Sequence, residues 1–130
     1  MIYNFTQHNA TEDQIASGVQ STPNAEIKSL LNFVDLPSAS DLKERAQKIA
    51  ELAKIEAKIA EIDNYTLLVN PPKCMIAGAP FFMSHLECEL KEVGFIVLYA
   101  FSQRVSVERH NEDGTVTKQN VFKHIGFIEA

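Results

Sequence analysis

Residues 74–101, CMIAGAPFFMSHLECELKEVGFIVLYAF, decide the fold of this chain. The run Cys74–Ala77 is almost continuously apolar, which is typical of a short strand that is buried on both faces. Gly78-Ala79-Pro80 follows, and after it apolar residues recur at helical spacing as far as Gly94. Residues 95–101 form a second apolar run. This order of strand, helix and strand predicts two parallel strands joined by a helical crossover.

The chain before this block supplies another strand and more helices. β-forming residues predict a strand over 2–6, which should run parallel to the two later strands. Capping signals and apolar spacing predict three helices, over 11–18, 25–33 and 38–62. The longest of them is amphipathic and is expected to pack on the core, with a short coiled coil as the alternative. Residues 64–70 are predicted to form a strand or an extended loop.

The end of the chain carries a hairpin signal. Asn111-Glu112-Asp113-Gly114 separates two alternating stretches, which predicts an antiparallel hairpin over 104–122. Phe127-Ile128 is expected to add a last short pairing. The whole chain, 1–130, is therefore predicted to be one α/β domain. We expect a Rossmann-like three-layer arrangement with a short parallel core and the antiparallel hairpin at its C-terminus.

The composition of the chain argues against some classes of function. The chain has 130 residues, of which 45% are hydrophobic, and a net charge of -5. That charge argues against a protein that coats duplex DNA, since such binding needs a basic surface. No membrane span or signal peptide is evident, so a cytoplasmic location is expected. Cys74 and Cys88 have no metal-binding or redox spacing, and both thiols are expected to stay free.

The candidate site lies where the three parallel strands end. In open parallel sheets, ligands bind outside the carboxyl ends of the strands, and these ends should share one side. The candidate residues are Thr6, Gln7, His8 and Asn9 after the first strand, Gly78, Ala79, Pro80 and Met83 after the second, and Ser102 and Arg104 after the third.

Two features of these strand ends suit a phosphate. A strand that runs through Gly78 into a helix leaves free N–H groups at the helix N-terminus, which attract anions. The alternative is that Gly78-Ala79-Pro80 is only a compact turn, and no Walker or dinucleotide motif is present. Arg104 could hold a phosphate, or it could pair with Glu108 on the surface. His8 could move a proton, or it could simply hold the local backbone.

His8 and Arg104 are therefore the candidate catalytic residues. The four histidines show no ligand spacing with cysteines or acids, so no metal site and no cofactor are expected.

The block from Met75 to Tyr99, with Met83-Ser84 inside its helix, resembles the corresponding block of CRISPR-associated Rossmann-fold (CARF) domains. The opening Asn4–His8, followed by Thr11–Gln14, is similar to the start of small CARF-related ring nucleases. The resemblance implies binding of cyclic oligoadenylates, metal-free cleavage in some members, and a homodimer around the two-fold symmetric ligand. The implied binding residues are Thr6, Gln7, His8, Gly78, Ala79, Pro80 and Met83. The single glycine of the turn and the long helical insertion after the first strand depart from the family pattern.

Three functions remain open from the sequence. The first is binding of a phosphate-bearing, nucleotide-like ligand, with cleavage through attack of a ribose 2′-hydroxyl on its phosphate. The second is a non-enzymatic interaction module of a phage or bacterial accessory protein, which would use the long helix and the 104–122 hairpin as contact surfaces. The third is a small-molecule hydrolase or transferase that uses the same pocket. The sequence does not decide whether a reaction is catalysed.

Overall fold

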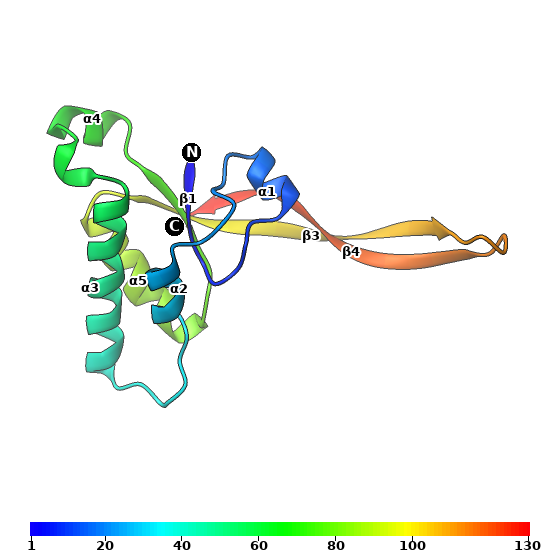
Figure 1. Ribbon diagram of the computed structural model, residues 1–130, viewed down its shortest axis with the longest axis horizontal. Helices are drawn as coiled ribbons and strands as arrows, with labels where there is room; N and C mark the ends of the chain where they lie inside the picture. Colours follow the sequence, from blue (N-terminus) through cyan, green and yellow to red (C-terminus); the bar gives the residue numbers. More distant parts are fainter.

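The computed structural model describes residues 1–130 and contains one four-stranded sheet (Figure 1). Its strands lie side by side in chain order: β1 (Ile2–Phe5), β2 (Lys73–Ile76), β3 (Ile96–His110) and β4 (Val116–Glu129). The first three strands run parallel, and β4 runs antiparallel to β3. The α/β class, the parallel core and the C-terminal hairpin are thus confirmed.

The helices follow their capping signals. They are α1 (Glu12–Ala16), α2 (Ala25–Leu30), α3 (Ala39–Glu56), the 3-10 turn η1 (Ile59–Glu61), α4 (Asn64–Val69) and α5 (Pro80–Glu92). The capping boxes of Thr11 and Ser38 are both formed. The prediction of one helix over 38–62 is too long, because Lys58 adopts a left-handed conformation with a φ of 53° and ends the helical run.

The expectation of a strand or extended loop over 64–70 is wrong. Asp63 caps α4 there: it accepts hydrogen bonds from the Thr66 backbone N–H at 2.7 Å and from the Thr66 hydroxyl at 2.8 Å. The β-forming character of Tyr65 and Val69 suggests extended backbone, but this local cap outweighs it.

Most of the core lies on one face of the sheet. Alternate strand residues such as Phe5, Ile76 and Val97 pack there against α2, α3 and α5. The opposite face carries a smaller cluster made of Ile2, Val19, Met75 and Leu98. The three-layer Rossmann-like arrangement stays a prediction. No helix of the chain is both long and apolar enough to cross a membrane.

β3 and β4 continue beyond the other strands as a long two-stranded projection, here called the arm (Figure 1). The arm consists of residues 102–110 of β3, the turn 111–115 and residues 116–124 of β4. The prediction that the third strand ends at Phe101 is wrong. Pairing with β4 carries β3 onward past a bulge at Phe101/Ser102, because both strands keep the two-residue alternation of extended backbone.

Candidate functional site

A cavity of about 240 Å³ lies at the carboxyl ends of the parallel strands. It is lined by Thr6, His8, Asn9, Thr11, Gln14, Met75, Ile76, Ala77, Tyr99 and Ala100. These residues come from β2 and β3, from the segments that directly follow β1 and β2, and from α1 with its cap. The ends of β1 and β2 and the adjoining part of β3 therefore face one hollow, as the parallel arrangement favours.

A buried polar network shapes the loop that follows β1. The Thr6 backbone N–H and hydroxyl donate to Asn4 Oδ1 at 3.2 and 2.7 Å. Asn4 Nδ2 donates to the His8 carbonyl at 3.0 Å, and the His8 N–H donates to Thr6 Oγ1 at 3.2 Å. Asn4 and Thr6 are both buried, so these bonds satisfy groups that water does not reach. The Thr6 hydroxyl is committed to this network and positions His8 rather than offering itself to a ligand.

The rim of the cavity carries hydrogen-bonding groups that are free. The side chains of His8 and Asn9 are exposed and make no hydrogen bond within the chain. Gln14 uses Oε1 to accept the Thr11 N–H at 3.0 Å, which leaves its Nε2 donors available. Three polar side chains thus offer donors or acceptors along one side of the hollow.

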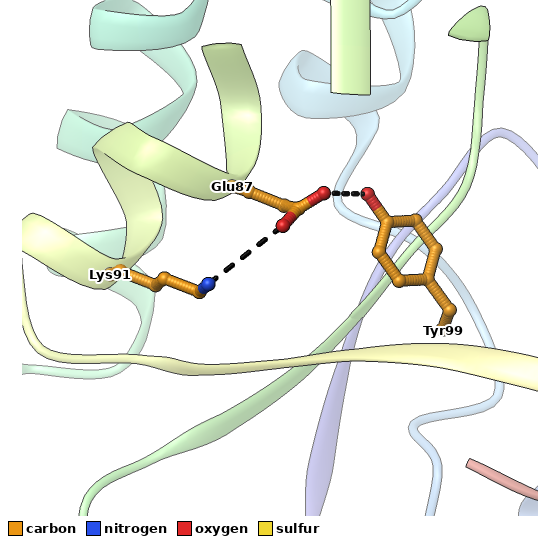
Figure 2. A network of polar contacts seen from close by, with 3 residues as sticks. All are labelled: Glu87, Lys91 and Tyr99. Atoms are coloured by element: carbon orange, nitrogen blue, oxygen red, sulfur yellow. Dashed lines mark hydrogen bonds and ion pairs between the residues drawn. The ribbon is translucent and has the colours of Figure 1, made fainter. Parts of the chain in front are cut away.

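Tyr99 forms part of the cavity wall, and its hydroxyl is hydrogen-bonded to a side chain of α5 (Figure 2). Its hydroxyl donates to Glu87 Oε2 at 2.5 Å, and Glu87 Oε1 lies 3.8 Å from Lys91 Nζ. Partial burial raises the pKa of Tyr99 above its ordinary value, and the hydrogen bond and negative charge of Glu87 raise it further. The phenol therefore stays neutral and its hydroxyl faces α5. Together with Met75 and Ile76, Tyr99 makes much of the lining apolar.

The Gly78-Ala79-Pro80 segment does not line this cavity. Ala79 is the N-cap of α5 and Pro80 its first residue, with no side chain capping the helix. Met83 is buried in the main core, and a Cβ added at Gly78 would come within 3.0 Å of Met83 Cε. Gly78 therefore packs closely against the end of the Met83 side chain, which supports the interpretation of this segment as a compact turn.

Arg104 and Ser102 lie in the arm and not at a strand end. Arg104 sits four residues beyond Ala100 on β3, about 13 Å further along the extended backbone. Its guanidinium is 6.0 Å from the ring centroid of Phe122 and makes no ion pair with Glu108. Gln7 is half-buried and does not line the cavity either. A single chain therefore brings Thr6, His8 and Asn9 to the cavity, but not Arg104.

Sequence reasoning missed several residues of the wall. Thr11 and Gln14 were identified as a capping box, and that box follows closely on His8 in the chain. Tyr99 lies on the strand that the sequence already identified, but its contact with Glu87 is a tertiary feature. No group of three or more His, Cys, Asp or Glu side chains is arranged to hold a metal ion. Cys74 is buried, which raises the pKa of its thiol, and Cys88 is exposed.

Comparison with known families shows which protein family the chain belongs to. A family model described as Uncharacterized protein MJ1673 family matches residues 1–128. The chain belongs to this family. No curated protein and no solved structure matches it. The region shared with the MJ1673 family spans both the cavity and the arm, while the resemblance to CARF domains stays a prediction.

Proposed function

We propose that this MJ1673-family chain binds a phosphate-bearing, nucleotide-like small ligand at the ends of its parallel strands. The observation that supports the proposal is a cavity that the segment after β1, the end of β2 and the adjoining part of β3 line together. In this proposal the sheet is used as in a Rossmann-like domain, with the ligand outside the carboxyl edge.

The chemistry of the lining suits a ligand with a flat ring and a polar group. Met75, Ile76 and the ring of Tyr99 offer apolar surface for a base. His8, Asn9 and Gln14 lie at the rim and can bond phosphate or ribose oxygens. His8 is also the residue that could carry a proton if a reaction follows.

The volume of the cavity limits the size of the ligand that it can hold. A volume of about 240 Å³ is slightly below the roughly 300–1,000 Å³ of most small-ligand pockets, so the cavity can hold no more than about one nucleotide. A cyclic oligoadenylate, the ligand class that the CARF resemblance implies, is several times larger, so one cavity would hold one of its nucleotides.

Calorimetric titration with adenosine monophosphate and with cyclic tetra-adenylate tests the proposal. We expect binding to the wild type and a loss of about tenfold or more in affinity in His8→Ala, because His8 supplies a rim hydrogen bond. His110→Ala, in the arm, is the matched control and should bind as the wild type does. Absence of binding to both nucleotides would refute the proposal. Chromatography of the incubated cyclic ligand shows whether it is also cleaved.

The arm favours a second function, that of a protein-interaction module. None of its residues is buried, and Phe122 is 76% exposed. A two-stranded ribbon is only marginally stable in water when nothing packs on it. We therefore propose the arm as a surface that contacts another protein chain. Such a complex should persist in His8→Ala and Arg104→Ala and should weaken in Phe122→Ser.

A further inference from the structure

Alternate residues of β4 have backbone groups without a partner in the chain. The Asn111 N–H donates to the Thr115 carbonyl at 2.9 Å, and His110 faces Val116 on the next rung. Hydrogen-bonded and non-hydrogen-bonded rungs alternate in an antiparallel pair. The N–H and C=O groups therefore point away from β3 at the following residues of the open edge: Val116, Lys118, Asn120 and Phe122.

We propose that a second copy of this chain pairs with that edge, β4 against β4 and antiparallel, about a two-fold axis at Gln119. This inference rests on the arm being a protein-contact surface, the second of the two functions proposed above. With the axis at Gln119, Lys118 faces Asn120 of the second copy and Val116 faces its Phe122. All four outward residues then lie on hydrogen-bonded rungs, which gives about eight bonds between the chains.

The side chains on these rungs fit the register. Val116 is 50% exposed and Phe122 is 76% exposed in the single chain. Pairing places each Val116 against a Phe122, twice per dimer, and aromatic residues opposite β-branched ones stabilise antiparallel pairs. A shift of the axis to Lys118 would put two lysines directly opposite each other, which is unfavourable.

Charge on the other side of the paired strands is also complementary. In the same register Lys123 lies opposite Thr115 of the second copy, beside the acidic turn that contains Glu112 and Asp113. Asp113 accepts hydrogen bonds from the Thr115 hydroxyl at 2.6 Å and from its N–H at 3.0 Å, and both lower the pKa of that carboxyl. The turn therefore keeps its negative charge next to Lys123 of the other copy.

A second copy of the chain would provide the backbone hydrogen bonds, the apolar contacts and the opposite charges together. A two-fold axis repeats every contact, so one edge provides both halves of an isologous interface. The product is a four-stranded ribbon, which is more stable than two strands alone. The outer edge of β3 in the arm is left open.

Sedimentation of the full chain across micromolar concentrations tests the pairing with matched proline variants. Asn120 and Ser106 face each other across the arm, and their N–H groups point to opposite edges. Proline removes such a group without breaking a β3–β4 hydrogen bond. We expect wild type and Ser106→Pro to dimerise equally, and Asn120→Pro to dissociate about a hundredfold more readily. Equal weakening by both prolines would overturn the proposed edge.

Cross-linking gives a readout that does not depend on the proline variants. The two Gln119 residues would face each other on a non-hydrogen-bonded rung, with Cα atoms about 4.5 Å apart. That separation allows a disulfide. In a Cys88→Ser background, Gln119→Cys should form a covalent dimer on mild oxidation. Val107→Cys, at the same level on β3, should not.

A wild-type chain that remains monomeric at every concentration, or equal cross-linking of the two cysteine variants, would overturn the self-pairing. If that monomer still bound a different protein through Phe122, the contact function of the arm would stand and only the identity of its partner would be wrong.

Discussion

In the body of the molecule, residues 1–101 and 125–130, each core strand has a face covered by helices, and side chains such as Phe5 and Leu86 are fully buried. In the arm the same kind of strand pairing continues with no buried residue. Burial of apolar surface stabilises the body, whereas the arm is held mainly by its backbone ladder and two open edges remain. The contrast indicates that the body maintains the fold and the cavity, while the arm is built for contact.

The largest expected change in the free energy of unfolding comes from truncating a buried side chain of the body, and the same kind of change in the arm should matter little. Leu86→Ala in α5 should lower the free energy of unfolding by about 3 kcal/mol, because it removes fully buried methyl groups from the core. Val107→Ala in the arm should cost about 0.5 kcal/mol or less. Urea denaturation followed by circular dichroism measures both. Similar losses would mean that the arm belongs to the cooperative core, contrary to the comparison.

A somewhat smaller effect is expected from the polar network under the cavity. Asn4→Ala should lower the free energy of unfolding by about 2 kcal/mol, because Thr6 and the His8 carbonyl lose buried partners. Asn9→Ala, at the exposed rim, is the control and should change stability by about 0.5 kcal/mol at most. If Asn4→Ala were as stable as this control, the network would not position the loop after β1.

The same substitution at one glycine of the body and one glycine of the arm should change stability by different amounts. Gly94, after α5, has a φ of 112°, and an added Cβ would lie 3.1 Å from Leu67 Cδ1. Gly114, in the turn of the arm, has a φ of 85° and no heavy atom within 4 Å of such a Cβ. Gly94→Ala should therefore cost about 2 kcal/mol, from strain and crowding, and Gly114→Ala about 1 kcal/mol, from strain alone. Thermal unfolding of both variants checks the ranking, which equal shifts would contradict.

The smallest expected change in stability comes from the hydrogen bond between Tyr99, in the cavity wall, and Glu87 on α5. Tyr99→Phe removes the bond to Glu87 and should cost about 1 kcal/mol near pH 8. The pKa of Tyr99 is raised by partial burial and by Glu87, so the folded chain keeps the phenol proton after the unfolded chain has lost it, from about pH 10 upward. The contribution of Tyr99 is therefore complete below pH 10 and declines above it.

Denaturation of wild type and Tyr99→Phe at several alkaline pH values measures this decline. The variant should lose less stability than the wild type above about pH 10, because it has no phenol at this position. Parallel losses in the two proteins would show that Tyr99 does not cause the alkaline sensitivity.

Much of the fold could be predicted because it depends on local patterns. The apolar runs at 74–77 and 95–101, the two capping boxes and the Asp113-Gly114 turn each specify a nearby structure. The prediction failed where a tertiary contact or a single cap decided the outcome. Pairing with β4 carries β3 past Phe101, and the Asp63 cap turns a β-forming stretch into α4.

The candidate site could be predicted in outline only. The rule that parallel strands end on one side leads to Thr6, His8 and Asn9, because they directly follow the first strand. Whether a side chain faces the cavity or the core depends on packing that spacing alone does not reveal. The helical spacing of Met83 is the same whether its side chain faces the cavity or the core. Only the structure shows that Met83 is buried in the core, next to Gly78.

An amide-resolved NMR titration of the full chain with adenosine monophosphate tests whether the body binds a nucleotide at the cavity. We expect shifts confined to the residues that line the cavity, such as His8, Asn9, Gln14, Ala77 and Tyr99, with the resonances of the arm unchanged. Saturation with no shift at these positions, or shifts confined to the arm, would contradict the assignment of ligand binding to the body.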